Sequence, residues 1–386
     1  MIAARARAFM LRRNAAAALL MIAAAFVIVH GPRVRANFHE SGWEDAQFIR
    51  HYETAIQSLP DCFTRMSVFQ GLYRPLTTNL YYYAGQKLFA GRIEVYHAIS
   101  VVVYLANGFL LYLICLNLLP GLWAYVPPII FVSRFSHVEI LANTVEFQSL
   151  LSTFFVLLAL KLFIESRARG RRLFGLLSMV AFGLALFSRE TAALFPVLLF
   201  VYEWLLDRQF SVRRILVTIL SAGLLIGLFA AAFASVVNHT RPPLTYDVSF
   251  SNIVRNYSAY LLAFLNMLTH RLQSVLMVPA IYGLSSALWM RTALIALFGA
   301  CAIFFVIQRR LKGRYTDSAR VFAFGLLFFA IVTAPYVVLH ERLFMRYGYF
   351  GCAGLAISSG VLLQEIAASA WQLPQLHAVR RGRVRK

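Results

Sequence analysis

The chain has 386 residues, of which 60% are hydrophobic and 14% are charged, and its formal net charge at pH 7 is +21. Soluble proteins are roughly 45–50% apolar, so this apolar share and a mean hydropathy of +0.68 exclude a water-soluble fold. The basic residues lie in short loops between apolar runs, which favours a topological role for them and predicts no nucleic-acid partner. Two of the four cysteines lie deep in apolar runs, so no disulfide framework is indicated.

Apolar segments that are candidates to cross a bilayer recur along the whole chain. They predict an all-α polytopic membrane protein of about ten transmembrane helices, with residues 1–386 forming a single transmembrane domain. The segments are 15–30, 95–117, 122–136, 146–165, 173–189, 191–206, 215–237, 292–308, 321–339 and 347–368.

The first and third of these segments contain residues that affect how they are interpreted. Arg12 and Arg13 precede the first one, as in a signal peptide, but His30-Gly31-Pro32-Arg33 has no small-residue cleavage site. We therefore expect an uncleaved first helix. The third segment is short and contains Pro127-Pro128, which predicts a broken helix whose freed backbone groups are satisfied by neighbouring helices.

Lysine and arginine are concentrated in every second loop, where acidic residues are nearly absent. These basic stretches are the N-terminus, 166–172, 208–214, 309–320 and the tail 369–386. Short loops with such an excess stay in the cytoplasm. The pattern predicts a multi-pass membrane protein with both termini in the cytoplasm.

The alternate loops then face outward, and two of them are long: residues 31–94 and 238–291. Segment 31–94 mixes acids, bases and aromatics, so it is too amphipathic to span the bilayer and too apolar for a free linker. Amphipathic helices lying at the membrane surface fit it best. Segment 252–290 is similar, although a hairpin of two further spans is an alternative that would raise the count to twelve.

Candidate reactive residues gather on this outer side. Glu44-Asp45 offers adjacent carboxylates for a general base or a metal ligand, although acids at a helix start are also common. Arg74, beside Tyr73, suits bidentate binding of a lipid phosphate, or simple anchoring at the interface.

Three later groups of charged residues lie on the same side. His137 and Glu139 suit metal ligation, but no third ligand has clear spacing. Arg189-Glu190 lies between two apolar runs, where it forms either a phosphate site or an ion pair. Arg342 and Arg346 lie between the last two spans, where they suit either phosphate recognition or the ordinary charge of a loop. Together these groups suit an anionic, lipid-linked substrate that reaches the outer surface from the bilayer.

At these residues the chain resembles the GT-C superfamily of membrane glycosyltransferases, particularly the branch similar to protein O-mannosyltransferases. The resemblance covers residues 38–365 and rests on the order of short elements. These are Glu44-Asp45, Tyr73-Arg74-Pro75-Leu76, Tyr96-His97, His137-Val138-Glu139, Ser188-Arg189-Glu190 and Glu341-Arg342. The chain departs from the family at two places. The family often has two aspartates where this chain has Glu44-Asp45. The family's Glu-Arg-Tyr element is Glu341-Arg342-Leu343 in this chain, and Tyr347 lies further along.

The resemblance implies inverting transfer of a sugar from a polyprenyl-phosphate donor to a hydroxyl of a protein, lipid or glycan. It places this reaction on the outer, periplasmic side of a bacterial cytoplasmic (inner) membrane. It implies catalysis by Asp45 with Glu44, where Asp45 takes the proton of the acceptor hydroxyl. The donor phosphate would be bound by residues among Tyr73, Arg74, Arg189, Arg342 and Arg346. His137, Glu139 and Glu190 would support the acceptor or a metal. Some members of the superfamily use a divalent metal and others do not, and the ligand set here is too small to decide.

Two other functions fit a multispanning chain. A flippase or carrier of polyprenyl-linked glycans would place polar residues at several depths of the bundle, whereas here they gather at its outer ends. An O-antigen polymerase or ligase has its large outer loop late in the chain, whereas here the most charged outer segment comes first.

Overall fold

The computed structural model describes residues 2–39, 43–67, 72–207, 211–236, 246–265, 317–339 and 344–383. All of the elements in these ranges are helices, which confirms the predicted all-α class. The longer ones are α1 (Ile2–Asn37), α2 (Trp43–Thr54), α4 (Tyr81–Phe89), α5 (Ile93–Leu118), α8 (Phe147–Arg169), α9 (Arg172–Ser188), α10 (Phe195–Leu206), α11 (Val212–Val236), α12 (Phe250–Leu265), α15 (Asp317–Val337) and α16 (Tyr349–Arg383).

Short helical turns connect these elements. They are α3 (Asp61–Thr64), η1 (Pro75–Leu80), η2 (Gly121–Tyr125), α6 (Val126–Val132), η3 (Phe135–His137), α7 (Val138–Ala142), η4 (Thr144–Glu146), η5 (Glu190–Leu194) and η6 (Met345–Gly348). Segment 31–94 thus contains the short helices α2, α3 and α4, and their position on a membrane surface remains a prediction. Only α12 and the residues just before it are described in segment 238–291.

Six helices of the described part are long and apolar enough to cross a membrane, so the chain is a multi-pass membrane protein. They are Asn14–Asn37, Ile93–Leu118, Thr144–Arg169, Val212–Val236, Ser318–Val337 and Arg346–Ala368. The apolar helices Gly121–Val132 and Arg172–Ser188 are shorter. Segment 292–308 lies outside the described residues, so the predicted count of about ten spans remains a prediction.

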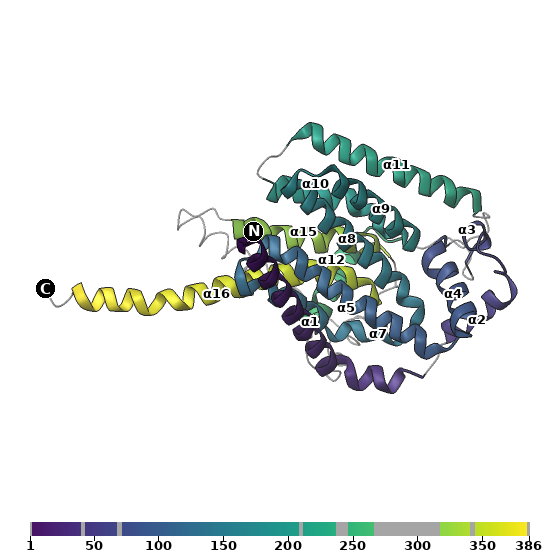
Figure 1. Ribbon diagram of the computed structural model, residues 1–386, viewed down its shortest axis with the longest axis horizontal. Helices are drawn as coiled ribbons and strands as arrows, with labels where there is room; N and C mark the ends of the chain where they lie inside the picture. Colours follow the sequence, from purple (N-terminus) through teal and green to yellow (C-terminus); the bar gives the residue numbers. More distant parts are fainter. Residues whose placement is uncertain are drawn as a thin grey trace.

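The helix bundle has two distinct ends. Helices α2, α3 and α4 lie at one end, and α16, which continues into the predicted tail 369–386, projects from the other (Figure 1). Helix α8 has 23 residues and is therefore about 35 Å long, enough to cross the roughly 30 Å hydrocarbon core. Its carboxyl end contains Lys161, Arg167 and Arg169, which pair with Glu165 and Glu203. The basic loop between α8 and α9 lies at the same end of the bundle.

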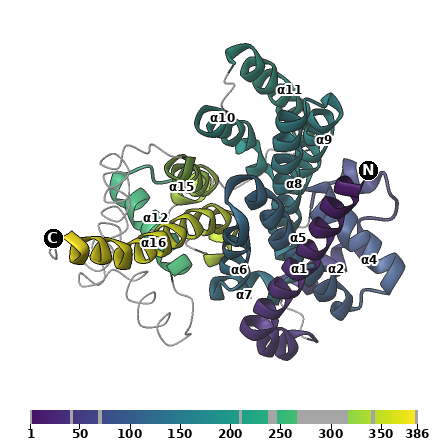
Figure 2. The same cartoon turned by 60° about the vertical axis from the view of Figure 1, so that its left-hand side comes forward.

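Helices α15 and α16 lie side by side with their backbones in close contact (Figure 2). A Cβ atom built on Gly354 would lie 2.4 Å from the carbonyl oxygen of Gly325, and one built on Gly325 would lie 2.5 Å from the oxygen of Gly354. Ser358 closes the contact, since its hydroxyl donates to the carbonyl of Phe322 at 2.9 Å. Small residues at the contact are how helices in lipid gain packing energy.

The variant Gly354→Ala is expected to destabilise the fold by about 1–3 kcal/mol, because the added methyl group forces the two backbones apart. Thermal unfolding in detergent measures the effect. Gly223→Ala in α11 is the matched control, since a Cβ at Gly223 meets nothing within 4 Å. Equal melting temperatures for the two variants would contradict the inferred role of the glycine contact.

Candidate active site

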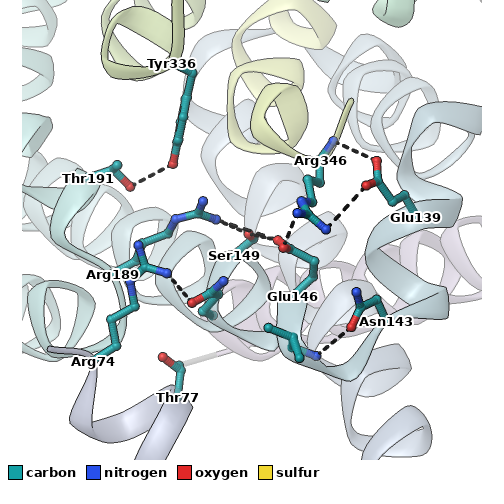
Figure 3. A network of polar contacts seen from close by, with 12 residues as sticks. Arg74, Thr77, Glu139, Asn143, Glu146, Ser149, Arg189, Thr191, Tyr336 and Arg346 are labelled. Atoms are coloured by element: carbon teal, nitrogen blue, oxygen red, sulfur yellow. Dashed lines mark hydrogen bonds and ion pairs between the residues drawn. The ribbon is translucent and has the colours of Figure 1, made fainter. Parts of the chain in front are cut away.

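Several polar residues of the segments predicted to face outward meet at the amino end of α8. Glu146 ends η4, and Ser149 follows one turn later, where its hydroxyl donates to Glu146 Oε2 at 2.7 Å. Arg189, at the carboxyl end of α9, donates to the Ser149 hydroxyl and lies 3.9 Å from Glu146 Oε2. Arg346, in the turn before α16, reaches Glu146 from another side, with its Nε 3.2 Å from Oε1 (Figure 3). The carboxylate of Glu146 thus joins three chain segments.

Arg346 is held by a second acid. Its NH1 lies 3.5 Å from Glu139 Oε1, and its backbone N–H donates to Glu139 Oε2 at 3.3 Å. The side chain of Glu139 is 38% exposed, whereas that of Glu146 is almost fully buried. The structure therefore brings together Glu139, Arg189 and Arg346 from the set that the sequence singled out.

Arg74 makes a different kind of contact. Its Nε donates to Glu190 Oε2 at 2.7 Å, its NH2 donates to the other oxygen of Glu190, and its NH1 donates to Gln148. Close by, Thr77 donates to the carbonyl of Ser188 at 2.7 Å. Each of the three guanidinium nitrogens of Arg74 already has an acceptor, so its described role is to tie η1 to η5 and α8.

Glu190 titrates below the usual range for a glutamic acid. Burial alone would raise the pKa of its carboxyl group, but the charge and hydrogen bonds of Arg74, together with the charge of Arg189, hold it at about 2. Since the pKa is lower in the folded state, the ion pair adds stability above pH 4.5, and this contribution is lost as the pH falls toward 2.

The variant Glu190→Gln is therefore expected to melt at a lower temperature than the wild type near pH 7. The gap should stay constant down to about pH 5 and close progressively below pH 4.5, because the wild type then loses the same charge. Thermal unfolding between pH 3 and pH 8 checks this. A gap that widens on acidification would contradict the sign of the shift.

A pocket opens beside the two arginines Arg189 and Arg346, where the space free of protein atoms is about 290 Å³, including space open to solvent. Hydroxyl-bearing residues of α8 line one side of it, and residues of α15 and α16 line the other. The full lining is Ser149, Ser152, Thr153, Arg189, Thr191, Val332, Tyr336, Arg346, Tyr347, Tyr349 and Phe350. Arg74 does not line it, so the pocket distinguishes Arg74 from the other two arginines.

Aromatic rings position Arg189 at the rim of this pocket. The rings of Tyr336 and Tyr347 are stacked with centroids 4.6 Å apart, and the Arg189 guanidinium carbon lies 5.3 Å and 5.6 Å from their centroids. The Tyr336 hydroxyl donates to Thr191 at 3.2 Å. Arg189 is 5% exposed, and its Nε has no hydrogen-bond partner among the described residues. A buried donor without an acceptor is costly, so an anion bound beside Arg189 would be stabilised by this N–H.

Asp45 is fully buried and bonds to η4. Its Oδ1 accepts a hydrogen bond from the Thr144 hydroxyl at 2.6 Å and lies 3.3 Å from the backbone nitrogen of Val145. Thr144 and Val145 directly precede Glu146, so Asp45 orients the turn that presents Glu146. Asp45 does not line the pocket. Its predicted role as the general base is untested by these contacts and remains a prediction.

Other predicted residues lie away from the pocket or outside the described part. The Tyr73 hydroxyl donates to the carbonyl of Phe63 at 2.9 Å, and its ring packs against phenylalanines of α9 and α11. His137 is buried, with its Nδ1 2.9 Å from the Tyr104 hydroxyl. The side chain of Glu44 and all of Arg342 lie outside the described residues.

No group of three or more His, Cys, Asp or Glu side chains with the geometry of a metal site occurs in the described part of the chain. His137 and Glu139, the residues predicted to support a metal, therefore gain no third ligand there.

The sequence analysis did not select Glu146, Gln148, Ser149 or Tyr336 as site residues. A usable signal existed for the first of these, because Glu146 opens the fourth apolar run and carboxylates at membrane depth are functional by default. Comparison with known proteins assigns no family: no protein-family model matches the chain, and no curated protein matches it.

Proposed function

We propose that this protein is a membrane glycosyltransferase of the GT-C type, which transfers a sugar from a polyprenyl-phosphate donor to an acceptor hydroxyl. The observation that carries the proposal is the pocket lined by Arg189 and Arg346, where Arg189 keeps an N–H without a partner. Arginine is the side chain best suited to phosphate, and burial excludes the water that would otherwise screen its charge.

The charges of the site suit a reaction in which a phosphate is the leaving group. Three carboxylates balance the three arginines in the described structure: Glu139, Glu146 and Glu190 against Arg74, Arg189 and Arg346. In the proposed reaction the acceptor oxygen attacks the anomeric carbon, and the bond from that carbon to the phosphate oxygen breaks. The polyprenyl phosphate leaves with the electron pair and gains negative charge, which Arg189 and Arg346 stabilise.

The acceptor hydroxyl loses its proton to a carboxylate, for which Asp45 is the residue predicted from the sequence. Because a single displacement occurs, the configuration at the anomeric carbon inverts. The scheme requires no nucleotide and leaves the use of a divalent metal to experiment.

The proposed location of the chemistry is the periplasmic face of a bacterial inner membrane. The site lies at the amino end of α8, and the basic clusters lie at its carboxyl end, about one bilayer thickness away. The positive-inside rule assigns the basic end to the cytoplasm. A polyprenyl chain would remain in the lipid while its phosphosugar reaches the pocket.

The direct test adds purified full-length protein to cell envelopes of a deletion strain, together with polyprenyl phosphates that carry radiolabelled single sugars. Protein-dependent movement of the label from the lipid to an acceptor supports the proposal. Vesicles in which the same donors cross the bilayer without any glycosyl transfer would favour the carrier function instead. Absence of both activities with every donor would remove the proposal.

A further inference from the structure

The pocket extends below the arginines into the bundle along one face of α8. Ser149, Ser152 and Thr153 stand at positions i, i+3 and i+4 and therefore share that face. Thr153 lies about 6 Å deeper along the helix axis than Ser149, at 1.5 Å per residue. Ser149 is hydrogen-bonded to both Glu146 and Arg189 and belongs to the charged layer at the mouth of the pocket.

The hydroxyls of Ser152 and Thr153 are different, because neither is hydrogen-bonded within the part of the chain that the structure describes. Both residues are buried, at 5% and 2% exposure, and both line the pocket. Serine and threonine in a helix commonly bond to a carbonyl of the preceding turn, as Ser188 does to Leu184 at 2.8 Å. Two buried hydroxyls that do not make this bond retain their hydrogen-bonding capacity for a ligand.

The opposite wall of the pocket is apolar and aromatic. It is formed by Val332 of α15 and by Tyr349 and Phe350 of α16, and the Tyr349 hydroxyl is already bonded to Asn107 at 3.0 Å. A sugar ring has the same two-sided character, since its edge bears hydroxyls and its face presents C–H groups.

We propose that Ser152 and Thr153 bind hydroxyl groups of the donor's sugar, so that they select a donor with one monosaccharide joined to the lipid phosphate. This inference rests on the proposed function and adds which part of the donor lies inside the bundle. The phosphate stays at the arginine layer, and the sugar ring lies beneath it between α8 and the α15–α16 wall.

The test compares phosphate diesters of equal charge that differ only in the sugar. Full-length protein in nanodiscs is titrated with farnesyl methyl phosphate and with farnesyl phosphates that carry mannose, glucose, galactose or arabinose. The readout is the ratio of the Kd for farnesyl methyl phosphate to the Kd for the best glycosyl ester. A ratio of at least about tenfold is expected for the wild type, as two neutral hydrogen bonds supply.

Ser152→Ala and Thr153→Val are each expected to lower this ratio, and the double variant should bring it close to one. Ser166→Ala is the matched control, because Ser166 lies on the same helix near its opposite end. Thermal unfolding of each single variant confirms that it folds, and a failure of one variant leaves the other as the test.

Three outcomes would overturn the inference. A wild-type ratio near one with tight binding of farnesyl methyl phosphate would mean that the pocket binds phosphate but does not contact the sugar, and the proposed function would stand. A high ratio that survives in the double variant would assign sugar recognition to other residues. Failure of the wild type to bind any of the probes would remove the proposed function together with the inference.

Discussion

Replacing Arg189 with lysine is expected to reduce the rate of sugar transfer by about 10²-fold, while the protein still folds. Lysine keeps the positive charge beside Glu146 and the two stacked tyrosines, so the ground-state charge balance survives. It lacks the planar fork and the Nε–H that has no acceptor among the described residues, and removal of one positioned donor to a developing anion typically costs about 10²–10³-fold.

The measurement is kcat/KM for transfer in the envelope assay, together with the melting temperature of each variant. Arg171→Lys is the matched control, since Arg171 is exposed in the basic loop at the other end of α8. Arg74→Lys provides a second comparison, because Arg74 holds Glu190 and Gln148 and does not line the pocket; its melting temperature should fall more than that of Arg189→Lys. Transfer by Arg189→Lys at more than half the wild-type rate would remove Arg189 from phosphate stabilisation.

The variant Asp45→Asn is expected to lower the transfer rate by about 10²–10⁴-fold with little change in donor binding. An amide cannot take up the proton of the acceptor hydroxyl, which is the contribution expected of a general base. The Oδ1 atom of asparagine can still accept the hydrogen bond from Thr144, so the turn that presents Glu146 should keep its position.

Two comparisons separate catalysis from a structural role for Asp45. Asp61→Asn changes a carboxylate of the same outer segment whose described bonds are local to α3, and it should transfer sugar normally. Thr144→Val removes the hydroxyl that bonds Asp45 and should lower the melting temperature. If Asp45→Asn instead lowers the melting temperature as Thr144→Val does and keeps normal transfer, Asp45 is a structural acceptor and the base is another carboxylate.

The sequence predicted the general fold well because its main signals are local. Apolar runs and loop charges depend only on neighbouring residues, and they located α5, α8, α9, α11 and α15 to within a few residues of the observed ends. The start of α16 was also located, but this helix continues to Arg383, well beyond the predicted limit at residue 368. The first helix continues through Pro32 to Asn37, beyond the predicted limit at residue 30. Pro127-Pro128 interrupts the third run as expected, and the helix there is only seven residues long.

The site was less accessible from sequence, since its assembly depends on contacts between distant segments. Arg74 and Glu190 were each selected, but their mutual ion pair joins residues 116 positions apart. The three arginines could not be ranked until the structure showed Arg74 saturated and Arg189 with an unpartnered N–H. Ser152 and Thr153 look like ordinary helix residues in a sequence, because nothing local reveals that their hydroxyls face a pocket.

The glycine contact between α15 and α16 also limits how the pocket can change shape. With Gly325 and Gly354 in backbone contact, we expect the two helices to move together, and they carry the pocket residues Val332 and Phe350. The facing side is joined by side-chain bonds of Arg74 and Arg189. Widening of the pocket is therefore expected to come from a displacement of η5 and the end of α9, where side-chain bonds, and among the described residues no backbone contact of this kind, join the segments.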